Sequence, residues 1–141
     1  MKRVVIVEDE TAAAVNLQSM LRAINPEVEV VAVLESVAEA VEFFGAKVEA
    51  DVVFMDIHLA DGESFRIFDS VEITSPIIFT TAYDEYALRA FKVNSIDYLL
   101  KPIKADDLQR ALEKFARLSG AEQSSYQSRI EKLIESSRQE Y

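Results

Sequence analysis

The sequence predicts an α/β fold, a doubly wound, five-stranded parallel sheet with helices on both faces. Two observations predict it. Short runs of β-branched and aromatic residues alternate along the chain with longer segments whose apolar residues recur at helical spacing. The short runs are also too apolar to leave one face in water, which is typical of parallel strands covered on both sides. The strands are expected at residues 4–7, 28–34, 52–55, 77–79 and 98–100.

Helical segments separate these runs. The first has one apolar face and stops before Pro26. The second opens on a capping box from Ser36 to Glu39, and Gly45 is expected to terminate it. Right-handed crossovers then give the flavodoxin type of (βα)5 sheet. The remaining helices are expected over residues 63–71, 85–91 and 105–118.

The composition is that of a soluble domain and excludes several classes of function. The chain has 141 residues, no cysteine, one histidine and a net charge of −10. Disulfide frameworks and cysteine-ligated metal sites are therefore excluded, and an acidic chain acting alone is a poor ligand for DNA phosphates. No run of about 20 apolar residues could span a membrane, and Glu8 and Asp9 interrupt any signal-peptide core. We expect a cytoplasmic protein.

Gly120 marks an expected domain boundary. Residues 1–118 carry the alternating pattern, and residues 119–141 are rich in Ser, Gln and charge with only a thin apolar stripe. Such a tail forms a stable helix only if it packs on something. A frayed linker and a docked helix both remain open for it.

Polar side chains follow four of the five predicted strands. The carboxyl ends of parallel strands are where ligands bind in such sheets, so these side chains are expected to meet at one edge. Each of them alone has an ordinary explanation as a turn, cap or surface residue. The set comprises Glu8 and Asp9 after the first strand, Asp56 after the third, Thr80 and Thr81 after the fourth, and Lys101 after the fifth.

The chemistry of this set points to phosphoryl transfer. Three carboxylates held together repel one another unless a cation balances them, and oxygen-only ligands favour Mg²⁺ or Mn²⁺. An aspartate can itself be the nucleophile and form an aspartyl phosphate. Lys101 and Thr81 could each hold a phosphoryl oxygen, which supplies the positioning and charge neutralisation that the reaction needs.

Four motifs at this spacing carry a family resemblance. They are Val7-Glu8-Asp9-Glu10, Phe54-Met55-Asp56-Ile57-His58-Leu59-Ala60-Asp61-Gly62, Thr80-Thr81-Ala82 and Tyr98-Leu99-Leu100-Lys101-Pro102. Over residues 1–118 the chain resembles the receiver domain of two-component response regulators. The stretch over residues 79–103 is similar to that of the LytTR (LytR/AlgR) transcriptional regulators.

The resemblance implies a metal site and a phosphoacceptor. Asp56 would accept the phosphoryl group and also ligate Mg²⁺. Asp9 would ligate the metal directly, Glu8 through a water, and His58 through its backbone carbonyl.

It also implies a switch. Thr81 would bind the phosphoryl group and move, Lys101 would pair with a phosphoryl oxygen, and Tyr98 would swing inward as Thr81 moves. The Lys101-Pro102 bond is expected to be cis, and Gly62 is expected to allow a left-handed turn.

Two bulky residues near Asp56 leave alternatives open. His58 is either an exposed loop residue or a side chain that controls water access, and so the lifetime of the aspartyl phosphate. Tyr83 could shield the acyl phosphate in the same way.

The resemblance further implies partners. A sensor histidine kinase would dock near the first helix. A homodimer would form through the fourth helix, fifth strand and fifth helix, and DNA would be bound only through a C-terminal domain that this chain lacks. The protein would be a signalling switch that catalyses only its own phosphorylation and dephosphorylation. The residues expected on the dimer face are Tyr86, Lys92, Asp97, Arg110 and Glu113.

Two other functions compete with this interpretation. A haloacid-dehalogenase phosphatase also uses an aspartate nucleophile, but it needs a second aspartate two residues later, where His58 stands. A pseudo-receiver would serve only as a dimerisation module, although all the expected site residues are present here. The three glycines are scattered, which disfavours nucleotide-binding loops.

Overall fold

The computed structural model describes residues 3–82 and 95–117. Within them a five-stranded sheet runs in the order β2-β1-β3-β6-β7, and all neighbouring strands are parallel. This confirms the predicted fold class. The strands are β1 (Arg3–Val7), β2 (Glu29–Leu34), β3 (Val52–Asp56), β6 (Ile77–Thr81) and β7 (Ser95–Leu100).

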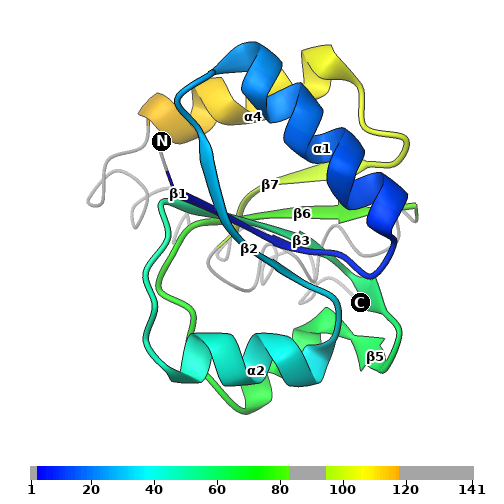
Figure 1. Cartoon of the computed structure of the whole chain (residues 1–141), viewed down its shortest axis with the longest axis vertical. Coiled ribbons are helices and arrows are strands. Elements are labelled where there is room, and N and C mark those ends of the chain that lie inside the picture. The colour runs from blue at the N-terminus through cyan, green and yellow to red at the C-terminus, as the bar shows by residue number, and fades with distance from the viewer. Residues whose placement is uncertain (1–2, 83–94, 118–141) are drawn as a thin grey trace, which may run out of the picture.

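Helices cover both faces of the sheet (Figure 1). The helices α1 (Thr11–Ile24) and α4 (Ala105–Arg117) lie on one face. The helix α2 (Val37–Gly45) lies on the other, together with a 3₁₀ helix, η1 (Ser64–Asp69). Of the helices that the structure describes, none is long and apolar enough to cross a membrane.

Alternation along the strands divides the core into two layers. Successive strand side chains point to opposite faces, so Ile6 and Phe54 pack with Leu17 and Leu108 on the side of α1 and α4. Their strand neighbours face the second layer, on the side of α2 and η1. That layer includes Val5, Val7, Val53, Met55, Ile77 and Phe79 together with Ala40, Phe44 and Ile67 of the covering elements.

The start of α2 confirms Ser36 as the predicted cap, but the returning bond of Glu39 goes to the residue before the cap. The Ser36 hydroxyl accepts a hydrogen bond from the Glu39 N–H at 3.0 Å, and the Glu39 carboxylate accepts one from the Glu35 N–H at 3.0 Å. The helix ends at Gly45 as expected. The left-handed residue that follows is Lys47, at φ 58°, rather than the glycine.

The prediction of an ordinary helix over residues 63–71 is wrong. The chain first forms a small hairpin of β4 (His58–Leu59) and β5 (Gly62–Glu63), and η1 follows it. Gly62 has φ 141°, so its expected backbone freedom is used in this hairpin. The hairpin leaves only a short segment for the helix. That segment is rich in aromatic and β-branched residues, which favour α-helix weakly.

Other predicted elements agree with the structure or lie outside it. The last helix begins at Ala105, and the Lys101-Pro102 bond is cis. The helix expected over residues 85–91 and the tail after residue 118 lie outside the described residues.

Candidate functional site

The sheet brings the predicted site residues to one edge. Glu8 and Asp9 follow β1, Asp56 ends β3, and Thr81 ends β6. The register pairs Asp56 with Thr80 across the two central strands. The Lys101 N–H donates to the Thr81 carbonyl at 2.7 Å, so the residue after β7 is held beside the end of β6.

Three carboxylates form a compact cluster at this edge. Oxygens of Glu8, Asp9 and Asp56 all lie within 4.8 Å of one another. Glu8 and Asp56 are each only 5% exposed, so water can screen their charges little. The residues fit a hard divalent cation such as Mg²⁺, because the side chains offer oxygen donors and carry excess negative charge.

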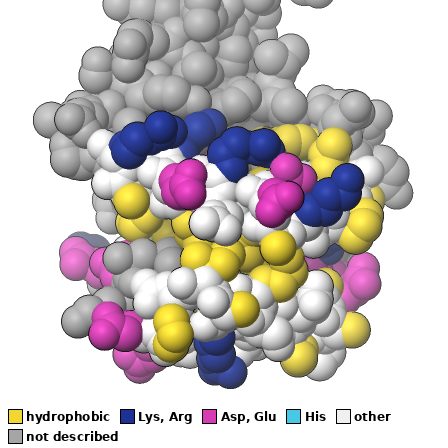
Figure 2. Space-filling model, turned by 90° about the horizontal axis from the view of Figure 1, so that it is seen from above, with side chains coloured by type: hydrophobic (Ala, Val, Ile, Leu, Met, Phe, Trp, Pro, Cys, Tyr) yellow, Lys and Arg dark blue, Asp and Glu magenta, His cyan; other side chains and the backbone are white. Residues whose placement is uncertain are grey.

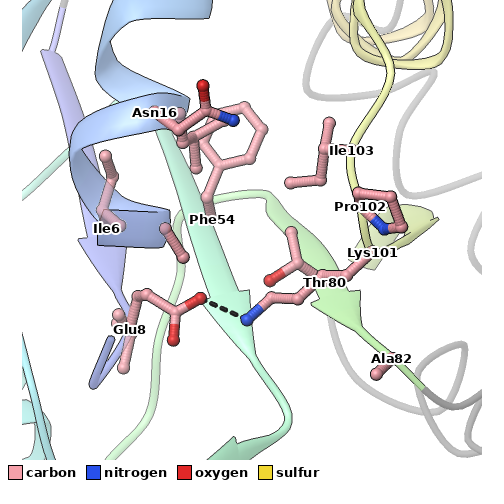
Figure 3. Close-up of a pocket in the computed structure, with 12 residues that line it drawn as sticks. Ile6, Glu8, Asn16, Phe54, Thr80, Ala82, Lys101, Pro102 and Ile103 are labelled. Carbon is pink, nitrogen blue, oxygen red and sulfur yellow. Dashed lines mark hydrogen bonds and ion pairs between the residues drawn. The ribbon is translucent and has the colours of Figure 1, made fainter. Parts of the chain in front are cut away.

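Lys101 lies between two of these carboxylates. Its Nζ forms an ion pair with Glu8 Oε1 (Figure 3). A second ion pair joins it to Asp56 Oδ2 at 2.9 Å. Burial by itself lowers the pKa of the Lys101 ammonium, but its hydrogen bonds to Glu8 and Asp56 outweigh burial and raise the pKa above its usual value. The ammonium therefore stays charged and balances part of the negative charge of the cluster.

The surroundings of Glu8 in this cluster raise the pKa of its carboxyl group. Burial raises its pKa from 4.5 to about 7; the hydrogen bond from Lys101 opposes this shift and the nearby charge of Asp56 adds to it. Its carboxylate also accepts a hydrogen bond from the Glu10 N–H at 3.2 Å. Glu8 therefore holds a proton more tightly than a free glutamate does, and a bound cation would favour the release of that proton.

We expect the metal-free protein to lose stability as the pH rises from about 5 to 8. The folded-state pKa of Glu8, about 7, lies above its unfolded value of 4.5. The stability linked to its proton is therefore complete below pH 4.5 and disappears as the pH passes 7. The Glu8→Gln variant should lack this component and be more stable than wild type at pH 8, by on the order of 2 kcal/mol. Urea unfolding of both proteins at pH 5.5 and 8 measures it, and equal pH dependence in the two would contradict it.

The other predicted site residues that the structure describes lie on β4, β6 and β7. Thr81 is fully buried, and Tyr98 is half-buried against the core layer of α2 and η1. His58 is exposed, and its N–H donates to Asp56 Oδ1 at 3.3 Å. Its carbonyl belongs to the same short strand, β4. Tyr83 lies outside the described residues.

A mostly apolar pocket of about 410 Å³ adjoins Glu8 and Lys101. Figure 3 shows Asn16 of α1, Phe54 of β3 and Ile103 lining it. The sequence alone does not reveal this pocket, because the space beside α1 depends on how the helix packs against the loop after β7.

Asp61 is a polar residue whose role sequence reasoning also missed. Its Oδ1 accepts a hydrogen bond from the Val37 N–H at 2.7 Å, and its Oδ2 accepts one from the Ala38 N–H at 3.1 Å. The bond from Val37 is the largest of the causes that hold the pKa of this carboxyl below its usual value. The Asp61-Gly62 dipeptide is itself a hairpin signal and could have located the turn, although not its contact with α2.

Only part of the predicted dimer face is described. Asp97 pairs with Lys114 at 3.6 Å, and Arg110 pairs with Asp107 at 2.8 Å within α4. Leu100 of β7 is 46% exposed beside them, and Glu113 is also exposed. Tyr86 and Lys92 lie outside the described residues.

Comparison with known proteins gives consistent matches. The family model for the response regulator receiver domain matches residues 4–113. The sensory transduction protein LytT of Enterococcus faecalis is 39% identical over 120 residues, which is 83% of this chain and 49% of that protein. The transcriptional regulatory protein BtsR of Salmonella typhi is 38% identical over 118 residues, 81% of this chain and 48% of that one.

A solved structure agrees with these matches. The response regulatory domain of mrkE from Klebsiella pneumoniae superposes with a TM-score of 0.71 at 25% identity, over 82% of this chain and 95% of that one. The chain spans about half the length of the curated relatives it matches.

Proposed function

Because this chain belongs to the response regulator receiver domain family, we propose that it accepts a phosphoryl group on Asp56 from a sensor histidine kinase. Mg²⁺ is the proposed cofactor, with Mn²⁺ as a substitute. The observation that carries the proposal is the cluster itself. An aspartate at a strand end lies within 4.8 Å of two further carboxylates and 2.9 Å from a lysine ammonium.

The proposed reaction is a direct displacement at phosphorus. A carboxylate oxygen of Asp56 attacks the phosphohistidine, the new P–O bond forms, and the P–N bond to the histidine breaks. Glu8, Asp9, Asp56 and the His58 carbonyl would hold the cation, which neutralises charge on the transferring group. The buried position of Asp56 keeps excess water from the acyl phosphate.

The proposed switch begins when Lys101 changes partner. A phosphoryl group on Asp56 adds about −1.5 to −2 charge and three acceptor oxygens. The Lys101 ammonium, now shared with Glu8, would pair with one of these oxygens, and the Thr81 hydroxyl would donate to another. Tyr98 would then fill the space that Thr81 leaves. This part of the proposal is supported by the position of the ring, which is half-buried and packs on the core layer of α2 and η1.

We propose that the kinase docks beside α1. Figure 2 shows the molecule from the side of α1 and α4, and several apolar side chains are exposed on this side. Val15 of α1 is 54% exposed, and the pocket lined by Asn16 and Ile103 lies next to the cluster. A helix of the kinase could bury this apolar surface while presenting its phosphohistidine to Asp56.

The output of the switch is also a proposal. A homodimer through the helix expected at 85–91, β7 and α4 would respond to Tyr98. The match covers about half of each relative, and a DNA-binding domain following a linker at residues 119–141 would act on transcription. The receiver itself would cover residues 1–118 and work in the cytoplasm. It is a signalling protein rather than a classical enzyme.

Incubation with acetyl phosphate followed by intact-mass spectrometry tests the proposal. We expect one phosphoryl adduct that requires Mg²⁺, disappears when the metal is chelated, and is absent from Asp56→Asn. The Asp69→Asn variant is the matched control, because Asp69 is an exposed carboxylate at the end of η1, and it should react like wild type. If wild type gains no adduct and beryllium fluoride causes no change in tyrosine fluorescence, the proposal is wrong.

A further inference from the structure

We propose that Asp61 is a positioning residue for the phosphorylation site. Its carboxylate fastens the β4–β5 hairpin, which carries His58, to the first turn of α2. The inference rests on the proposed function. It gives α2 a role in positioning the site, although α2 contacts neither the proposed metal nor the phosphoryl group.

The hairpin is firmly held at its base. The Ile57 N–H donates to the Thr80 carbonyl at 3.1 Å, and the Ser64 N–H donates to the Ile57 carbonyl at 2.7 Å. Ile57 and Ser64 are both fully buried. These hydrogen bonds attach the base of the hairpin to the sheet.

The hairpin needs a second attachment at its tip. Its ladder pairs only His58 with Glu63 and Leu59 with Gly62. A two-stranded hairpin is marginally stable even when it is longer. The tip residues Ala60 and Asp61 are exposed, so packing does not hold them. The two hydrogen bonds of the Asp61 carboxylate supply that attachment.

The first turn of α2 is a fixed anchor for these bonds. A helix starts with N–H groups that have no partner inside the helix. Asp61 satisfies those of Val37 and Ala38, and the Ser36 hydroxyl satisfies that of Glu39. The helix itself is held by Ala40 and Phe44 in the core layer. A negative charge at this end is also favoured by the helix dipole.

The position of the hairpin matters to the site through His58. Its N–H donates to Asp56 Oδ1 at 3.3 Å, and its carbonyl is one of the four groups proposed above to hold the metal. If the tip is freed, His58 must be ordered each time that the metal binds, and this lowers metal affinity. Once the metal is bound the geometry is restored, so the maximal rate of phosphorylation should change little.

Measured Mg²⁺ dependence separates this role from simple helix capping. The rate of phosphorylation by acetyl phosphate is followed against Mg²⁺ concentration for wild type, Asp61→Ala, Asp61→Asn and Ser36→Ala. Calorimetric titration with Mg²⁺ alone accompanies it. The Ser36→Ala variant is the matched control, because it removes a cap from the same helix end and leaves the hairpin attached.

We expect Asp61→Ala to raise the half-saturating Mg²⁺ concentration about 10-fold, with a maximal rate within about twofold of wild type. The Asp61→Asn variant keeps one acceptor and should fall between the two. Ser36→Ala should melt a few degrees lower but need no more Mg²⁺. Because linkage is reciprocal, Mg²⁺ should also slow hydrogen exchange at the Val37 and Ala38 amides in wild type and not in Asp61→Ala.

The outcomes distinguish this inference from the proposed function. If Asp61→Ala and wild type need the same Mg²⁺, or if Ser36→Ala raises the requirement equally, the positioning role is overturned. If wild type binds Mg²⁺ but gains no phosphoryl group, the proposed function fails while the calorimetric comparison still decides the role of Asp61. Wild-type protein that binds no Mg²⁺ would overturn both.

Discussion

Replacing Lys101 by alanine is expected to destabilise the metal-free protein at pH 8 and to tighten its binding of Mg²⁺. Lys101 pairs with Glu8 and Asp56, whose side chains are only 6% and 7% exposed. Its loss leaves two buried carboxylates without a counter-charge. Removing only one partner of a buried ion pair in this way is strongly destabilising. Because the lysine side chain is itself 20% exposed, water offsets part of the cost, and we expect a loss of about 2 to 3 kcal/mol.

The gain in Mg²⁺ affinity has the same cause. In wild type, the ammonium already balances part of the negative charge of Glu8 and Asp56, so a cation that binds the carboxylates gains less from that charge. Without the ammonium the carboxylates repel one another until the cation arrives. We expect affinity to rise on the order of 10-fold, which corresponds to about 1.4 kcal/mol. Saturating Mg²⁺ should then recover most of the lost stability.

Urea unfolding with and without Mg²⁺, together with calorimetric titration, measures both effects. Lys104→Ala is the matched control, since Lys104 is exposed and lies three residues further along, and it should change neither quantity appreciably. Unchanged stability in Lys101→Ala, or weaker Mg²⁺ binding, would show that the lysine does not compete with the cation.

Much of the site could be predicted because parallel topology determines it. Glu8, Asp56 and Lys101 are far apart in the sequence, but each lies at or just after the carboxyl end of a parallel strand. A strand ending is visible as the point where an apolar run stops, and parallel neighbours end at the same edge. The gathering of these three side chains therefore follows from local patterns alone.

The segment after Asp56 could not be predicted in the same way. Residues 63–71 have apolar spacing that is compatible with a helix, but the chain had already turned into the β4–β5 hairpin. What decides the outcome is the bond from Ser64 N–H to the Ile57 carbonyl and the contact of Asp61 with α2. The latter joins residues 24 apart in sequence, and no local pattern encodes it.

Two buried phenylalanines in the sheet should differ in the cost of their removal. Phe54 is 1% exposed in the core layer of α1 and α4, and Phe79 is fully buried in the opposite layer. Truncation of a buried phenylalanine to alanine costs about 3 to 5 kcal/mol, and more where the cavity cannot collapse or fill. We expect Phe54→Ala at the low end of this range and Phe79→Ala at the high end.

The difference follows from what surrounds each ring. Phe54 already lines the pocket beside Glu8 and Lys101, so its removal enlarges a space that water can enter. Phe79 is fully buried and packs against the Phe65 ring at a centroid distance of 5.3 Å, so we expect its removal to leave an enclosed void. Urea midpoints with unchanged m-values would measure both losses, and an equal or larger loss for Phe54→Ala would contradict this account. A change of packing should therefore cost less free energy in the layer of α1 and α4, which borders the proposed kinase-docking pocket. It should cost more in the layer of α2 and η1, against which Tyr98 packs. A partner could then enter beside α1 without disturbing the packing on which the proposed switch would depend.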